Sequence, residues 1–292
     1  MVGAEDGRSL EVFTAGPPDG LPVVFHTGTP SGLIAFQPRI DAATAHGLRT
    51  VQYARPGYGK SDPRPGRQVA DAAADVAAIL DHLGAAEFVT AGLSGGGPHT
   101  LATAALLPDR CLAVASIAGC APYPADGLDW TAGMAEENIA EFGAAIAGEA
   151  EITAILQAEA EKLADVTAEQ ITQALGGLAS AADRAVLTGE YAAYSAASFR
   201  AAVSTGIVGW RDDDLAFVQD WGFSLDGLGS AVPVSIWQGD QDAMVPFGHG
   251  QWLAERIPLA HAHLLAGEGH LTLSITSLDA IFGELAELAL RR

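Results

Sequence analysis

The sequence predicts an α/β protein, with a mostly parallel sheet flanked by helices and an inserted block of further helices. Three features indicate this class: short apolar runs recur, helix-patterned segments separate them, and the alternation stops between about residues 121 and 231. Strands that are apolar throughout are covered on both faces, and strand–helix alternation favours parallel pairing. We therefore expect a core of residues 1–120 and 232–292, and a helical cap, or lid, of residues 121–231.

Six apolar runs are the expected strands. They are rich in the β-branched and aromatic residues typical of strands, and they are bounded by turn residues. In chain order they are residues 21–26 (LPVVFH), 48–54 (LRTVQYA), 87–93 (EFVTAGL), 112–119 (LAVASIAG), 232–239 (VPVSIWQG) and 260–267 (AHAHLLAG).

Three segments of the core carry a helical pattern. In residues 68–84 the apolar positions recur at three- and four-residue spacing, and Gly84 ends the pattern. Residues 97–110 are apolar as far as Pro108. Residues 278–292 are amphipathic and finish with two arginines, which suit the negative end of a helix.

The stretch from 121 to 231 is helix-rich. Ser180 is a candidate N-cap for one of its helices. Its carboxylates have no histidine partner at the spacing of a metal site, so we expect a solvated acidic face and no metal. These carboxylates are Glu136, Glu137, Glu141, Glu149, Glu151, Glu159 and Glu161.

Composition and charge limit the partners. Acidic side chains number 36 against 15 basic ones, giving a net charge of −21 at pH 7. This charge repels phosphate backbones and anionic bilayers. The first 16 residues lack the basic and apolar regions of a signal peptide, and no apolar stretch is long enough to span a bilayer. We expect a cytoplasmic monomer or homodimer that acts on a small molecule and binds neither nucleic acid nor membranes.

One serine stands among four glycines, in the stretch AGLSGGGPH (91–99). Ser94 follows an expected strand and precedes an expected helix. A reversal this sharp forces the turning residue into an unfavourable backbone conformation, and Gly92 and Gly96 must be small to avoid a clash. This G-x-S-x-G pattern in a strand–turn–helix context predicts a nucleophilic serine; the alternative is a flexible glycine-rich loop.

A serine nucleophile needs a base, and the base needs a carboxylate that orients it. The expected order along the chain is serine, acid, histidine. Asp242 follows the run 232–239, and His270 lies in the loop GEGHLTL after the last run. Asp240 is the rival acid, with turn capping as its other role.

Acyl transfer also needs N–H donors for the developing oxyanion. One is the backbone N–H of Gly95, directly after the nucleophile and at the positive end of a helix. The second is expected from the turn HTGTPSG (26–32), where Thr29 is the candidate. Thr29 or Ser31 is also a candidate cap for the next helix.

Together these residues resemble the α/β-hydrolase superfamily, in the cap-bearing branch of proline iminopeptidases, epoxide hydrolases, C–C hydrolases and esterases. The stretches that carry the resemblance are HTGTPSG, ARPGYGKSD, AGLSGGG, GDQDAMVP and GEGH, which lie in family order across nearly the whole core. The resemblance implies an eight-stranded sheet, a helical cap and a triad of Ser94, Asp242 and His270. It disfavours epoxide and haloalkane chemistry, because those relatives place aspartate at the position of Ser94.

The expected activity is hydrolysis of an ester or lactone bond in a small, largely apolar substrate, without metal or cofactor. Alternatives on the same triad are C–C hydrolysis, perhydrolysis and iminopeptidase-like cleavage, with Glu136 and Glu137 as candidate ligands of a free amino terminus. A further alternative is a ligand-binding protein with little turnover. Four aromatic residues of the expected cap are candidate pocket walls: Trp130, Tyr191, Trp210 and Trp221.

Overall fold

The computed structural model describes residues 1–292. Its main sheet has seven strands. In chain order they are β3 (Val12–Ala15), β4 (Leu21–His26), β5 (Leu48–Tyr53), β6 (Phe88–Leu93), β7 (Cys111–Ile117), β8 (Val234–Gly239) and β9 (His261–Leu265).

The spatial order of the strands is β3-β5-β4-β6-β7-β8-β9. Edge strand β3 is antiparallel to β5, and every other neighbouring pair is parallel. All six predicted runs form strands of this sheet, so the predicted α/β class with a mostly parallel sheet is confirmed.

The sheet has seven strands where the resemblance implied eight. The first residues of the chain pair with each other, in a separate ribbon of β1 (Val2–Gly3) and β2 (Ser9–Leu10). Gly7, at a φ of 87°, belongs to the turn that folds this segment back on itself. The segment therefore adds no strand to the sheet edge.

Twelve α-helices accompany the strands. They are α1 (Gln37–Ala45), α2 (Ala72–Leu83), α3 (Gly96–Leu106), α4 (Glu136–Ala147), α5 (Glu149–Leu163), α6 (Ile171–Ala174), α7 (Ala181–Val186), α8 (Gly189–Val203), α9 (Val208–Phe217), α10 (Phe247–Arg256), α11 (Leu273–Thr276) and α12 (Leu278–Leu290). The helix after the 26–32 turn begins only at Gln37, with Phe36 as its N-cap, so neither Thr29 nor Ser31 caps it.

Helices cover both faces of the sheet, and successive strand residues feed two separate cores. Phe25 packs on the side of α1 and α12, whereas Val24 packs on the side of α2, α3 and α10. Alternation of this kind follows from the two-residue period of a strand. It explains why most of the runs are continuously apolar and do not alternate with polar residues.

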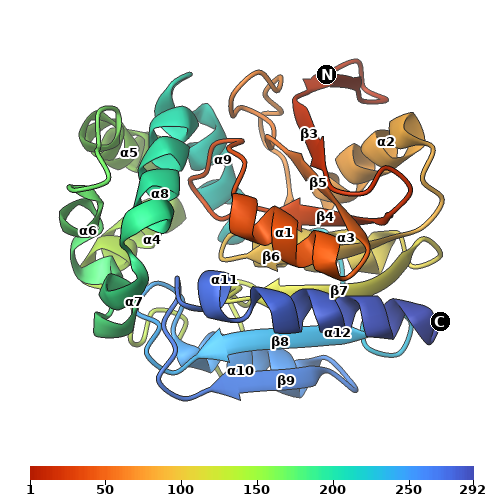
Figure 1. Cartoon of the computed structure of the whole chain (residues 1–292). Helices are drawn as coiled ribbons and strands as arrows, with labels where there is room; N and C mark the ends of the chain where they lie inside the picture. The colour runs from red at the N-terminus through yellow and green to blue at the C-terminus, as the bar shows by residue number, and fades with distance from the viewer.

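Helices α4 to α9 all lie between β7 and β8 in the chain and gather at one end of the sheet (Figure 1). The arrowheads of β8 and β9 point toward this end in the same view. Ser180 is the N-cap of α7, as predicted, and accepts a hydrogen bond from the Asp183 N–H. No helix of the chain is both long and apolar enough to cross a membrane.

Candidate active site

Ser94 occupies a sharp turn between β6 and α3. Its φ is +56°, a left-handed conformation that is costly for a residue with a side chain. The Ser94 N–H donates to the Ile117 carbonyl at 2.8 Å, and the Ser94 carbonyl accepts from the Gly97 N–H at 2.8 Å. These bonds fix the turn, which favours the strained elbow over a flexible loop.

The glycines around Ser94 are required by close backbone contacts. A β-carbon on Gly92 would lie 2.1 Å from the Gly96 carbonyl oxygen, and one on Gly96 would lie 2.1 Å from the His26 carbonyl oxygen. A β-carbon on Gly97 would lie 2.7 Å from the α-carbon of Gly119. Only glycine permits the reversal at the first two positions, and the third lets α3 pack against the loop after β7.

Asp242 and His270 meet at the carboxyl ends of β8 and β9. His270 Nδ1 lies 2.8 Å from Asp242 Oδ2, and both side chains are buried. Asp242 Oδ1 accepts the N–H groups of Met244 and Val245 at 2.8 Å each, and its Oδ2 also accepts from Gln238 Nε2 at 2.9 Å. The carboxylate is thus fixed and presents one oxygen to the imidazole.

The pKa of His270 lies above its usual value of 6.5. Burial alone lowers this pKa, but the carboxylates of Asp242 and Asp183 favour the imidazolium and outweigh it. Asp240, the rival acid, is exposed and accepts the Gly267 N–H at 2.8 Å. It caps the turn, so the geometry favours Asp242 as the partner of the histidine.

Two cavities meet at Ser94. Ser94, His270 and Thr29 line the smaller one, of about 90 Å³. Ser94, Gly95 and Thr29 also line the larger one, of about 510 Å³. The structure therefore places the predicted nucleophile, base and N–H donors at two cavities that share Ser94 and Thr29 in their walls, with Asp242 hydrogen-bonded to the histidine.

Gly95 and Thr29 lie against each other at this space. A β-carbon on Gly95 would lie 2.4 Å from Thr29 Oγ1 and 3.0 Å from Phe217 Cζ. The backbone N–H groups of Gly95 and Thr29 donate to no acceptor within the protein. Both are free to receive an oxyanion.

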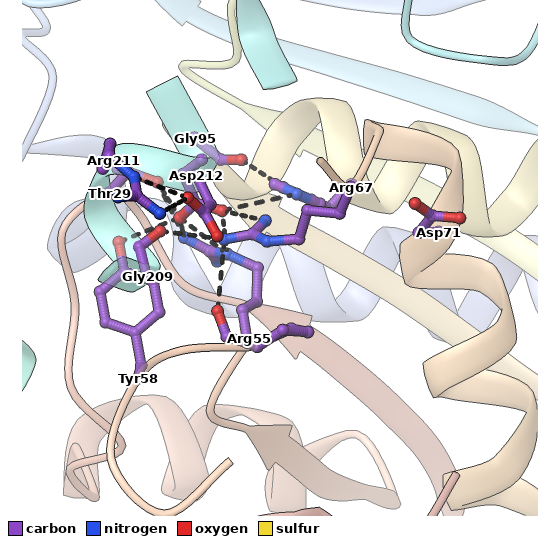
Figure 2. A network of polar contacts seen from close by, with 12 residues as sticks. Thr29, Arg55, Tyr58, Arg67, Asp71, Gly95, Gly209, Arg211 and Asp212 are labelled. Atoms are coloured by element: carbon purple, nitrogen blue, oxygen red, sulfur yellow. Dashed lines mark hydrogen bonds and ion pairs between the residues drawn. The ribbon is translucent and has the colours of Figure 1, made fainter. Parts of the chain in front are cut away.

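A buried ionic cluster lies directly behind Thr29, and the sequence alone did not reveal it. Asp213 of α9 pairs with Arg55 Nη2 and with Arg67 Nη1, each at 2.6 Å. Thr29 Oγ1 and Tyr58 OH donate to Asp213 Oδ2 at 2.8 and 3.0 Å. Figure 2 shows the arginine, tyrosine and threonine side chains converging on this point.

Electrostatics hold the cluster in its ionised form. Burial by itself raises the pKa of Asp213, but the two guanidinium groups reverse this and hold it far below its usual range. Burial also lowers the pKa of the neighbouring His99 to about 3, so His99 is neutral. A sequence signal was present: Trp210, Asp213, Asp214 and Phe217 share the spacing of one buried helical face.

The larger cavity is strongly acidic. Its carboxylic residues are Glu136, Glu137, Glu141, Glu159 and Asp214, and no lysine, arginine or histidine lines it. The expectation that the acidic residues form a solvated face is thus wrong for Glu141. This residue accepts from Trp210 Nε1 at 2.8 Å and lies against the buried carboxyl of Asp214.

Two of the four predicted aromatic wall residues reach the cavities. Trp210 lines the larger one and Tyr191 the smaller one. Trp130 and Trp221 line neither and are buried in an apolar cluster that also contains Met134 and Phe217 of the larger cavity's wall. Their indole N–H groups are satisfied there by the carbonyls of Ala121 and Phe217, so these two assignments to the pocket are corrected.

Comparisons with known proteins agree with this architecture. Residues 22–274 match the family model described as alpha/beta hydrolase fold. A non-heme chloroperoxidase from Streptomyces lividans is 33% identical over 148 residues, which cover 50% of this chain and 54% of that protein, so the chain spans about half the length of this relative.

Two solved structures are similar over nearly their full lengths. A thermophilic esterase from Thermogutta terrifontis has a TM-score of 0.68 at 20% identity, covering 99% of this chain and 97% of its own. A bromoperoxidase from Bacillus anthracis has a TM-score of 0.70 at 21% identity, covering 100% and 99%. At these identities the structures establish the fold, and the family match over most of the chain establishes membership. The chain belongs to the α/β-hydrolase fold family.

Proposed function

We propose that this hydrolase cleaves ester or lactone bonds with Ser94 as nucleophile, His270 as base and Asp242 as the orienting acid. The observation that carries the proposal is the fixed Asp242–His270 pair at 2.8 Å, with His270 lining the same cavity as the strained Ser94. A serine becomes nucleophilic near neutral pH when a base oriented in this way can reach its hydroxyl.

The reaction follows from these positions in two steps. His270 Nε2 takes the Ser94 proton as Oγ attacks the carbonyl carbon, and the N–H groups of Gly95 and Thr29 receive the oxyanion. The tetrahedral intermediate collapses, the C–O bond breaks, and His270 gives the proton to the leaving alkoxide. Water, deprotonated by His270, then attacks the acyl-enzyme and releases the acid and free Ser94.

The larger cavity sets the size and polarity of the substrate. Its volume of about 510 Å³ suits a small molecule. Apolar walls such as Leu175, Phe199 and Phe217 match the expected apolar substrate, but the carboxylic lining adds a polar side. We infer an acyl substrate that has an apolar part and also a polar or cationic group, which can lie beside the carboxylic residues of the cavity.

Covalent labelling tests the nucleophile. We expect a fluorophosphonate probe to modify one residue, Ser94, as identified by peptide mass spectrometry. We also expect the esters or lactones that the enzyme hydrolyses to slow this labelling. If the protein hydrolyses esters but the probe does not modify Ser94, the assignment is contradicted. A tight ligand that blocks the probe without being cleaved would favour the ligand-binding alternative, and peracid formation on adding hydrogen peroxide would favour perhydrolysis.

A second candidate is cleavage beside a protonated amine, as in iminopeptidase-like enzymes. The carboxyl pair of the half-buried Glu141 and the buried Asp214 favours it. Burial and the nearby Glu141 raise the pKa of Asp214 well above its usual range, so Asp214 keeps its proton and shares it with Glu141. One proton shared between two carboxyl groups leaves one negative charge, and Asp214 Oδ2 has no hydrogen-bond partner in the protein, so the pair keeps an acceptor at the cavity wall.

Matched esters test this candidate. We expect a p-nitrophenyl ester whose acyl chain ends in trimethylammonium to have a kcat/KM about tenfold above that of its tert-butyl isostere, since a tenfold ratio needs only ~1.4 kcal/mol. Glu141→Gln should remove the preference, whereas Glu161→Gln, at an exposed position of α5, should keep it. Equal kcat/KM values for the two esters with the wild-type protein would rule this candidate out.

A further inference from the structure

Two fully buried carboxylates of the α4–α9 segment form hydrogen bonds with the two loops that carry the candidate catalytic groups. Asp213 of α9 and Asp183 of α7 are each 0% exposed. The first lies against the loop of Thr29, and the second against the loop of His270. Neither residue lines either of the cavities at Ser94.

Asp213 fixes the Thr29 loop directly and through Arg55. It accepts the Thr29 hydroxyl at 2.8 Å, 184 residues away in the chain. Arg55, held by the same carboxylate, donates to the carbonyls of Thr27 and Gly28 at 2.6 and 3.0 Å and to Thr29 Oγ1 at 2.8 Å. These contacts turn the loop carbonyls toward Arg55. The Thr29 N–H donates to no acceptor in the protein, and Thr29 lines the same cavity as Ser94.

Asp183 fixes the other loop in the same way. Its Oδ1 accepts the N–H groups of Leu271 and Thr272 at 2.7 and 3.3 Å. A β-carbon on Gly269 would lie 2.4 Å from this oxygen, so the carboxylate touches the backbone on both sides of His270. The other carboxylate oxygen, Oδ2, accepts the Ser180 hydroxyl at 2.8 Å, which anchors the carboxylate to the start of α7.

We propose that Asp183 and Asp213 are positioning residues of the reaction, and that the α4–α9 segment is thereby a fixed part of the catalytic site. Asp213 holds the Thr29 N–H at the oxyanion, and Asp183 holds His270 toward Ser94. Buried ion pairs add little stability compared with apolar side chains of similar size, so packing alone does not call for the Asp213 cluster. The inference rests on the proposed serine mechanism and goes beyond it.

The two residues predict different kinetic signatures. For Asp213→Asn we expect kcat to fall about 10²-fold, the usual cost of one oxyanion donor, with KM within about threefold and the pH profile in place. For Asp183→Asn we expect a smaller fall in kcat and an acid limb shifted to lower pH. The shift follows because the carboxylates that face His270 are those of Asp242 and Asp183, and both raise its pKa.

Thr29 provides a variant that keeps the ionic cluster whole, should Asp213→Asn fail to fold. Thr29→Val removes the hydroxyl that links the loop to Asp213 and Arg55 and keeps the backbone N–H. Its kcat should fall at least tenfold, and Thr29→Ser, which restores the hydroxyl, should return most of it. Asp165→Asn, an exposed acid of the same segment, should match the wild type.

The experiment measures kcat, KM, the pH profile and the rate of fluorophosphonate labelling for each variant and for wild type, with melting temperatures alongside. Variants that melt lower but keep wild-type kcat and labelling rates would overturn the inference, because Asp183 and Asp213 would then only support folding. Lack of both hydrolysis and labelling in the wild type would overturn the serine mechanism and this inference together. The wild-type measurements distinguish these two failures.

Discussion

The Ser94→Ala variant is expected to hydrolyse esters at least about 10⁴-fold more slowly than the wild type, because no other side chain can form the acyl-enzyme. The elbow itself should persist, since the bonds of residue 94 to Ile117 and Gly97 use only its backbone. Steady-state assays with a chromogenic short-chain ester, together with the melting temperature, check both parts.

Ser94→Gly is the matched variant. It is equally inactive, but glycine adopts the +56° φ of this position without steric cost. We therefore expect its melting temperature to be at least that of Ser94→Ala. Turnover in either variant at more than about 10⁴ times the uncatalysed rate would show that Ser94 is not the nucleophile.

Asp242→Asn is expected to lower kcat/KM by about 10⁴-fold, because an amide stabilises neither the required tautomer nor the imidazolium of His270. The pH profile should change as well. In the wild type only neutral His270 accepts a proton, so activity rises with pH through the raised pKa, with a midpoint above 6.5. Without the Asp242 charge the pKa of His270 falls, and the acid limb moves to lower pH.

A neutral ester assayed from about pH 4 to 9 measures this shift without titrating the substrate. Asp240→Asn is the control, since it makes the same chemical change two residues away at an exposed turn. An acid limb that keeps its midpoint in Asp242→Asn would mean that another group controls it. If Asp240→Asn loses activity and Asp242→Asn does not, Asp240 is the acid that orients His270.

The fold was largely predictable because its signals are local. The run 21–26 coincides with β4, and the run 260–267 shortens only to His261–Leu265. The missed strand β3 (VFTA) has only four residues, all half-buried at the sheet edge, so its apolar stretch is too short to stand out as a run. The expectation of an eighth strand was wrong because a tight turn in the first ten residues pairs this segment with itself, so it does not join the main sheet.

The candidate site was predictable where its residues follow strand ends. The carboxyl ends of parallel strands share one edge of a sheet, so Ser94, Asp242 and His270 were expected together without knowledge of any contact. The pocket walls were harder. Trp130 and Trp210 look alike in the sequence, yet one is packed in an apolar cluster and the other lines the cavity.

The sequence by itself determined the α/β class, the elbow at Ser94 and the order of serine, acid and histidine, because each depends on a few neighbouring residues. Only the tertiary structure decided which acids of the 121–231 stretch are solvated and which are buried. Asp213 meets Arg55 across 158 residues of chain, and Asp183 meets Leu271 across 88. Such contacts depend on how whole helices pack, and a buried carboxyl group stays ionised only where that packing supplies its donors, as at Asp213.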